Sequence, residues 1–248
     1  MEAPKRIVYL GTKPIGARCF EYLLEKQEEL NFVVIAAGTQ ERKEFGASAS
    51  VADLAEKCGI PLIAGPDELP DCDIIYSVQY HKILKERHIN KAKQIAVNLH
   101  LAPLPDYRGC NQFSFAIFNG AVTFGVTIHE IDTGVDSGDI LFEERFPLPD
   151  DIWVKDLFDR TVGKGQELFE QTLSAVIKGH YTRTPQSELV PERGMQLYNR
   201  KDISWLKQLS LEEPAFKTAR RIRATYMPGF EPPYFTIGDK KMFITTED

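Results

Sequence analysis

Arg6-Ile-Val-Tyr-Leu10 is a short apolar run, and it is followed by the turn Gly11-Thr-Lys-Pro-Ile-Gly16 and by an amphipathic segment over residues 17–24. This order predicts a buried strand, a turn and a helix. The alternation continues in the elements predicted next, a strand at 32–38, a helix at 50–58 with Ser50 as N-cap, and a strand at 73–77. Strands that alternate with helices favour right-handed crossovers. The expected fold class is therefore α/β, a Rossmann-like and mainly parallel sheet with flanking helices.

The second half of the chain continues this mixture. Segments 111–119 and 153–178 predict helices, the longer one closed by Gly179, and segments 123–130 and 140–146 predict strands. Residues 40–49 are polar and charged, which predicts a mobile loop.

The composition changes after Gly179. A polar connector over 182–193 lacks apolar periodicity, and it leads to a predicted helix at 211–224 and a hairpin at 235–244 that turns at Gly238-Asp239. We expect two domains, a catalytic core over 1–180 and a small C-terminal extension with helix and β-hairpin over 181–248.

Composition narrows the class of protein. Of 248 residues, 43% are hydrophobic and 27% charged, as in an ordinary globular protein, and no apolar run approaches the roughly 20 residues of a membrane span. The N-terminus lacks the apolar region of a signal peptide, so we expect a cytoplasmic protein that does not bind membranes. Four irregularly spaced cysteines predict reduced thiols, and a net charge of −6 argues against a nucleic-acid partner.

Three polar residues are suited to acyl transfer. Asn98 and His100 follow an apolar run, and because they are separated by one residue they share a face of an extended segment. Asp136 lies in Asp132-Thr-Gly-Val-Asp-Ser-Gly-Asp139. An amide can hold an oxyanion, an imidazole can move a proton, and a carboxylate can fix the imidazole. Each residue alone is equally consistent with a turn or a satisfied polar group.

The acidic loop also resembles a site for a hard cation, because calcium loops carry carboxylates at alternating positions. The twelfth position, where a bidentate glutamate closes such a loop, is Glu143, but it lies within a strand-like apolar run and not in a loop. We therefore expect no metal.

The expected fold also places the pocket. In open sheets of this kind, ligands bind outside the carboxyl ends of the strands. Val78-Gln-Tyr80 and Asn98-Leu-His100 both lie at such ends, so we expect them to share a pocket with the loop from Asp132 to Asp136.

Basic residues suggest where an anion binds. Lys13 beside a helix N-terminus can hold a diphosphate or a carboxylate, although it is equally well explained as a solvated turn lysine. The predicted helix at 211–224 carries several arginines and is followed by an aromatic loop with Tyr226. It is either a solvated face or a site where arginine forks contact a diphosphate and an aromatic ring stacks on a base.

Taken together, three stretches resemble the core of the folate-dependent formyltransferases: Asn98-Leu-His-Leu-Ala-Pro-Leu-Pro-Asp-Tyr-Arg-Gly109, Phe124-Gly-Val-Thr-Ile128 and Ile131-Asp-Thr-Gly-Val-Asp-Ser-Gly-Asp-Ile140. The resemblance implies transfer of a formyl group from 10-formyl-tetrahydrofolate to a primary amine. It also implies a catalytic set of Asn98, His100 and Asp136. By the same resemblance, the folate pocket consists of Val78, Gln79, Tyr80, Asp132, Thr133, Gly134 and Val135.

The resemblance also bears on the acceptor amine. The turn at 105–109 and the segment at 198–205 look most like the nucleotide-linked amino-sugar N-formyltransferases, whereas the tRNA enzymes carry a further C-terminal domain. We expect a dTDP-4-amino-4,6-dideoxy sugar as substrate, a homodimer, and a role in O-antigen and lipopolysaccharide synthesis. The candidate substrate-binding residues are Lys13, Tyr107, Arg108, Arg220, Arg223 and Tyr226.

Other functions fit the same residues. A glycinamide ribonucleotide formyltransferase uses another small amine, and a formyl-tetrahydrofolate hydrolase applies the same three residues to water. A nucleotide-sensing α/β module requires neither Asn98 nor Asp136, and a metal-dependent hydrolase is inactivated by chelation.

Overall fold

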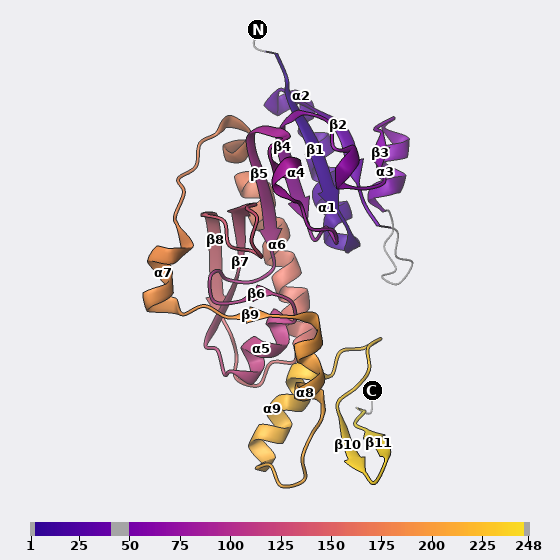
Figure 1. Ribbon diagram of the computed structural model, residues 1–248, viewed down its shortest axis with the longest axis vertical. Helices are drawn as coiled ribbons and strands as arrows, with labels where there is room; N and C mark the ends of the chain where they lie inside the picture. The colour runs from indigo at the N-terminus through magenta and orange to yellow at the C-terminus, as the bar shows by residue number, and fades with distance from the viewer. Residues whose placement is uncertain (1–2, 41–49, 246–248) are drawn as a thin grey trace.

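The computed structural model describes residues 3–40 and 50–245, and its centre is a seven-stranded sheet in the order β3-β2-β1-β4-β5-β7-β8 (Figure 1). The strands are β1 (Lys5–Gly11), β2 (Phe32–Gly38), β3 (Leu62–Ile63), β4 (Cys72–Val78), β5 (Ala92–His100), β7 (Thr123–Glu130) and β8 (Ile140–Pro147). Strands β1 to β5 are parallel, whereas β7 runs antiparallel to both β5 and β8. The predicted α/β fold with a mainly parallel sheet is confirmed.

Helices cover the sheet on both faces. They are α1 (Lys13–Glu25), α2 (Gln27–Leu30), α3 (Val51–Lys57), α4 (Glu86–Ile89), α5 (Gln112–Phe118) and α6 (Val154–Lys178), with a 3-10 turn at Pro66–Glu68. Apolar residues of α1, α3 and α6 pack with alternate residues of β1, β4, β5 and β7 in one core. Residues 69–89 cover part of the other face, where Ala96 of β5 is buried.

This division fixes where the polar residues of β5 point. Val97 and Leu99 belong to the core under α1 and α6, and side chains alternate along a strand. Asn98 and His100 therefore lie on the opposite face, where the structure leaves room for a site.

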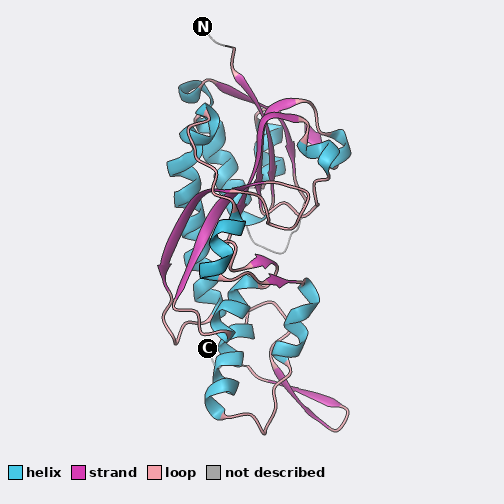
Figure 2. Ribbon diagram, turned by 60° about the vertical axis from the view of Figure 1, so that its left-hand side comes forward, coloured by secondary structure: helices cyan, strands magenta, loops and turns pink. Residues whose placement is uncertain are grey.

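A second core joins the C-terminal unit to the sheet. It gathers α5, the start of α6 and the beginning of β7 with α8 (Ile203–Lys207) and α9 (Ala215–Thr225). The hairpin of β10 (Tyr234–Ile237) and β11 (Lys240–Phe243) projects from the end of the molecule opposite β2 and β3 (Figure 2). The predicted hairpin is confirmed, with its turn at Gly238-Asp239.

The connector after α6 returns to the centre of the molecule. Residues 186–193, expected to be irregular, form α7 (Gln186–Arg193), and Leu197–Tyr198 is β9, which pairs with β6 (Arg108–Gly109). A short 3-10 turn, Arg200–Asp202, precedes α8. Helix α7 buries only Gln186, so apolar periodicity could not reveal it, and polar contacts hold it in place. The division at residue 180 stays a prediction.

Two further predictions concern the start of helix α9 and the loop after β2. Helix α9 begins at Ala215 rather than at 211, because Pro214 directly precedes it and has no N–H to continue a helix backwards. The predicted loop at 41–49 lies outside the described residues. Within residues 3–40 and 50–245, none of the helices has the length and apolar character needed to cross a bilayer.

Candidate active site

The antiparallel pairing of β5 and β7 brings four polar side chains onto one face. Asn98 pairs with His129, and His100 pairs with Thr127. Residues directly opposite each other in a sheet share a face, so all four side chains project away from the core under α1 and α6. His100, Thr127 and His129 are buried, whereas Asn98 is partly exposed.

Asp136 completes this group from the loop between β7 and β8. Its Oδ2 lies 3.7 Å from Nδ1 of His100, and its Oδ1 lies 3.6 Å from Nε2 of His129. Oδ2 also accepts a 2.9 Å hydrogen bond from the N–H of Gly109 in β6. The three residues predicted to be catalytic are thus brought together, and the carboxylate lies between two imidazoles.

The surroundings of Asp136 favour its ionised form. Burial alone raises the pKa of this carboxyl, but its interactions with His100 and His129 and the hydrogen bond from the Gly109 N–H outweigh burial and hold the pKa well below its usual range. An ionised carboxylate at this position attracts a cation, whether an imidazolium or the ammonium group of a substrate.

Hydrogen bonds to carbonyls fix both imidazoles. Nε2 of His100 lies 2.8 Å from the Tyr107 carbonyl oxygen, and Nδ1 of His129 lies 2.8 Å from that of Glu130. A carbonyl only accepts, so each of these nitrogens carries the proton. Nδ1 of His100 therefore faces Asp136, and Nε2 of His129 accepts from the Asn98 amide at 3.2 Å.

The loop that carries the Tyr107 carbonyl is itself anchored. The Thr127 hydroxyl donates to the Ala102 carbonyl at 2.9 Å and accepts from the Leu104 N–H at 3.3 Å. Arg193 of α7 donates to the Leu104 carbonyl at 3.1 Å. These contacts hold the loop against β7 and so keep the Tyr107 carbonyl on His100.

The tip of β4 lies beside the tip of β5, as expected. Ser77 pairs with Asn98 and Val78 with Leu99. Gln79 adopts a left-handed φ of 56°, its carbonyl accepts from the Thr12 hydroxyl, and its Oε1 accepts from Nζ of Lys13 at 2.8 Å. Lys13 is therefore adjacent to the strand tip predicted to bind folate.

The acidic loop is closed by its own side chains. Asp132 accepts from the N–H of Gly134 at 3.0 Å and from the Ser137 hydroxyl at 2.7 and 2.8 Å. Gly138 packs so closely on the Glu130 carbonyl that a Cβ there would lie 2.0 Å from its oxygen. Thr133 and Val135 are exposed on the loop. Within the described ranges, no group of three or more His, Cys, Asp or Glu side chains is arranged to hold a metal ion.

Tyr107 and Arg108, predicted to contact the substrate, have other partners. The Tyr107 ring is buried against Phe124 and Tyr198, with centroids 5.7 and 6.3 Å away, and burial raises its hydroxyl pKa to about 12. Tyr107 reaches the site through its carbonyl. Arg108 donates twice to Gln186.

Arg220, Arg223 and Tyr226 form a separate group around the loop after β8. Arg220 pairs with Asp150 at 3.2 Å, Arg223 donates to the Asp150 carbonyl at 2.9 Å, and the Tyr226 ring lies 6.2 Å from that of Trp153. Leu148, just before this loop, bonds to Val122 at the start of β7, whereas His129 lies near its end. At the usual strand rise, the two groups are about 20 Å apart.

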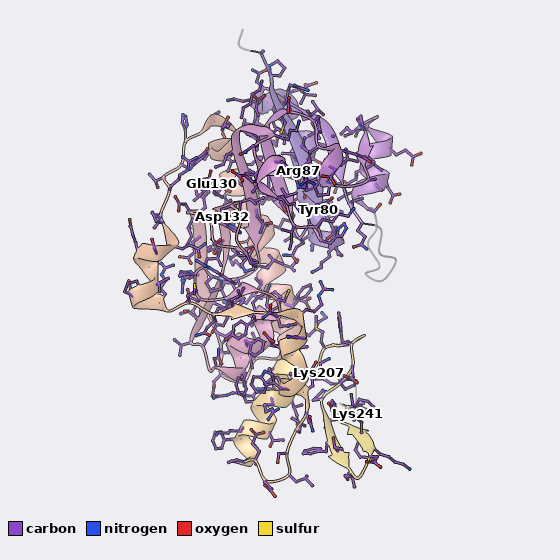
Figure 3. The ribbon with its side chains drawn as sticks, viewed as in Figure 1. Tyr80, Arg87, Glu130, Asp132, Lys207 and Lys241 are labelled. Atoms are coloured by element: carbon purple, nitrogen blue, oxygen red, sulfur yellow. The ribbon has the colours of Figure 1, made fainter. Side chains whose placement is uncertain are left out.

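In Figure 3, Tyr80 and Asp132 lie in the upper part of the molecule, well above Lys207 and Lys241 of the C-terminal unit.

His129 is the residue that sequence reasoning misjudged. It is absent from the residues predicted for the site, yet it is 3% exposed and contacts Asn98 and Asp136. The available clue was that Thr127 and His129 alternate with Val126 and Ile128, which marks a polar face on an otherwise apolar strand. Knowing that β7 pairs with β5 was also required.

Comparison with known proteins agrees with this geometry. The formyl transferase family model matches residues 68–173. A methionyl-tRNA formyltransferase of Lactobacillus gasseri is 31% identical over 193 residues, which are 73% of this chain and 62% of the relative. The chain therefore spans less than two thirds of the length of this curated relative.

Two solved structures share the fold. An N-formyltransferase from Helicobacter canadensis, described in complex with folinic acid and dTDP-3-aminofucose, has a TM-score of 0.76 at 23% identity, covering 95% of this chain and 85% of that one. A 4-N formyltransferase from Francisella tularensis has a TM-score of 0.75 at 19% identity, covering 98% and 97%. The matched segment 68–173 contains Asn98, His100, Asp136 and His129, so the part of the chain that carries the candidate site is similar to the formyl transferase family.

Proposed function

We propose that this protein transfers the formyl group of 10-formyl-tetrahydrofolate to the primary amine of a nucleotide-linked amino sugar. The observation that carries the proposal is that His100 and His129 both contact an ionised Asp136 and that Asn98 is bonded to His129, at the strand ends of a segment similar to formyl transferases. No metal takes part in the reaction.

The reaction requires one bond to form and one to break. The acceptor nitrogen attacks the formyl carbon, and the bond from that carbon to N10 of the folate then breaks. The products are the N-formyl sugar and tetrahydrofolate. The attacking amine must lose a proton, and N10 must gain one.

Asp136, His100 and Asn98 each have a role in these reaction steps. The ionised carboxylate of Asp136 attracts the acceptor ammonium, which releases one proton to solvent before it attacks. Once the new C–N bond has formed, Nδ1 of His100 takes a second proton from that nitrogen and passes it to N10. The Asn98 amide donates one N–H to His129 and directs its other N–H at the oxyanion of the tetrahedral adduct.

The folate is assigned to the pocket beside the β4 tip. Val78, Gln79 and Tyr80 form one wall, and the loop Asp132-Thr-Gly-Val135 forms the other. Backbone groups of these two segments can satisfy the polar edge of a pterin. The left-handed turn at Gln79 and the closed Asp132 loop preorganise those groups.

The acceptor is assigned as a dTDP-4-amino-4,6-dideoxy sugar, which supplies O-antigen and lipopolysaccharide synthesis. Support comes from the shared fold with sugar N-formyltransferases, whose chains align with this one over most of both lengths. In this assignment Arg220, Arg223 and Tyr226 bind the nucleotide, and Lys13 is a candidate contact beside the β4 tip. Tyr107 and Arg108 act through the Tyr107 carbonyl on His100 and the Arg108 contact with Gln186. A homodimer and a cytoplasmic location stay predictions.

The similarity to methionyl-tRNA formyltransferases favours a second candidate acceptor, methionyl-tRNA. A panel assay separates the two. The purified protein is incubated with 10-formyl-tetrahydrofolate and one of four additions: dTDP-linked 3- or 4-amino sugars, methionyl-tRNA, glycinamide ribonucleotide, or no acceptor.

Formylation is detected as an increase in the mass of the acceptor, and the release of tetrahydrofolate is measured in parallel. We expect formylation of a dTDP-amino sugar at a rate far above that with any other acceptor. Formylation of tRNA alone would replace the proposed acceptor, and formate release without acceptor would identify a hydrolase. An Asp136→Asn variant controls for contaminating activity.

A further inference from the structure

Gln186 is a buried amide that the reaction scheme does not use. It is the first residue of α7, and its side chain is 2% exposed although it is polar. Its Oε1 accepts from Nε and Nη2 of Arg108 at 3.0 and 2.7 Å. Its Nε2 donates to the carbonyls of Asp136 and Gly138 at 2.9 and 2.7 Å.

These four contacts use the full capacity of the amide. A glutamine side chain has two N–H donors and an oxygen with two lone pairs, and all of them are occupied here. A buried amide with every group satisfied is held in one orientation, because any rotation breaks hydrogen bonds that water cannot replace.

Gln186 binds the backbone of the loop that contains Asp136, and this loop has an unusual backbone conformation. Asp136 has a φ of 49°, in the left-handed region that residues other than glycine seldom adopt. In this conformation its carboxylate accepts from the Gly109 N–H and lies between His100 and His129. The two N–H groups of Gln186 bind the carbonyl of Asp136 itself and that of Gly138 two residues later.

The other end of Gln186 fixes the neighbouring strand. Arg108 directly precedes Gly109, whose N–H donates to Oδ2 of Asp136. Gln186 thus joins the backbone of the Asp136 loop to β6, and β6 in turn holds the carboxylate. The backbone of Asp136, through Gln186 and Arg108, and its carboxylate, through Gly109, are therefore both connected to β6.

We propose that Gln186 is a positioning residue that sets the location of the Asp136 carboxylate between His100 and His129. This inference rests on the proposed function for its kinetic consequence, but its geometric content can be tested without turnover. The readout is the pair of ¹⁵N chemical shifts of the two imidazole nitrogens that face the carboxylate.

The experiment compares Gln186→Met with wild type by ¹⁵N NMR of the histidine imidazoles at one pH. Methionine has a similar volume and introduces no charge. Asp136 is the carboxylate that faces both His100 and His129, and Arg108 and Asp132 are the other charged groups around it. If the carboxylate moves away, the resonances of Nδ1 of His100 and Nε2 of His129 should both move from their wild-type positions, because these are the two nitrogens that face it. The resonances of His88, which pairs with Asp67, should not change.

Gln94 provides a matched control. Its Nε2 also donates to two carbonyls, those of Val176 and Ile177, and its Oε1 accepts from Lys5, but it lies at the opposite end of β5 from the site. Gln94→Met should leave the imidazole resonances of His100 and His129 unchanged. Thermal unfolding of both variants shows that the comparison concerns folded protein.

Should Gln186→Met fail to fold, Gln186→Asn takes its place. It keeps the amide but is one methylene shorter, so it cannot reach Arg108 and both carbonyls together, and displaced resonances of both imidazoles are again expected. With the acceptor found in the panel assay, kcat should fall at least tenfold while the folate KM is unchanged. Resonances of His100 and His129 that match wild type in a folded Gln186 variant would overturn the proposal. Displaced resonances in a protein that formylates no amine would contradict the proposed function instead.

Discussion

The amide Nδ2 of Asn98 lies 3.2 Å from Nε2 of His129, and the two residues face each other directly across β5 and β7. Because Nδ1 of His129 bonds to the Glu130 carbonyl, Nε2 is an acceptor in the neutral ring. The amide therefore turns its nitrogen, not its oxygen, toward His129. This relationship orients the group that the proposed mechanism aims at the oxyanion.

The first prediction concerns His129. His129→Phe removes the acceptor and frees the Asn98 amide to rotate, so kcat should fall by about one to two orders of magnitude, less than the loss of an oxyanion donor itself. His88→Phe is the control, because His88 is equally buried but contacts Lys85 and Asp67 instead. Equal kcat values in the two variants would remove His129 from the site.

The second prediction concerns the catalytic pair. His100→Asn and Asp136→Asn should each lower turnover by roughly two to four orders of magnitude, because proton transfer and charge stabilisation act mainly in the transition state. Folate affinity, measured by calorimetry with a non-reactive analogue, should stay nearly unchanged. Near wild-type turnover at saturating substrates in either variant would contradict the assigned roles.

The third prediction concerns the pH dependence of the reaction. The acceptor amine reacts only when unprotonated, so kcat/KM should rise from acidic toward mildly alkaline pH, while Asp136 stays ionised throughout this range. The measurement is initial rates at low acceptor concentration from pH 6 to 9. A flat profile would argue against a protonatable amine as acceptor.

The fourth prediction concerns the pH dependence of stability. The folded-state pKa of Asp136 lies below its ordinary value, so its contribution to the free energy of unfolding is present above about pH 4. That contribution is lost as the pH falls through the folded pKa. Urea titrations from pH 5 to 2 should show the difference between wild type and Asp136→Asn shrinking by on the order of 1–3 kcal/mol. Parallel curves would mean that the carboxylate has no stabilising partner.

The fifth prediction concerns the arginines of α9. The Arg223 Nε is buried and has no hydrogen-bond partner among the described residues, and Tyr226 lies beside it in sequence. If this group holds the nucleotide, Arg223→Ala or Tyr226→Ala should weaken nucleoside diphosphate binding by about 1–3 kcal/mol in calorimetric titrations. Lys217→Ala, on the same helix and exposed, should have no effect. Unchanged affinity in both variants would leave the helix as a support for the Asp150 loop.

Local pattern accounts for what the sequence predicted. The period of two in β5 is enough to place Asn98 and His100 on one face, and the strand and helix alternation is enough for a mainly parallel sheet. The capping box of Ser50 and Asp53 could likewise be anticipated from adjacent residues. These features depend on neighbours within a few positions.

The residues that were missed depend on distant pairing. His129 enters the site because β7 is antiparallel to β5, and Gln186 enters because the connector after α6 returns to the Asp136 loop. Arg220 and Arg223 carry the charge expected of a phosphate site, but their contacts with Asp150 are set by how α9 packs on α5. No local rule fixes any of these pairings.

The two-residue pairing of β6 with β9 has a consequence for biosynthesis. Gly109, with a φ of 84°, packs against the Tyr198 carbonyl, and its N–H is the one that reaches Asp136. On a ribosome the central sheet and α6, which covers one face of it, are complete once residue 178 has emerged, but β6, whose Gly109 holds the carboxylate, waits for residues 197–198. A nascent chain released before that point therefore carries the folded scaffold without the completed centre.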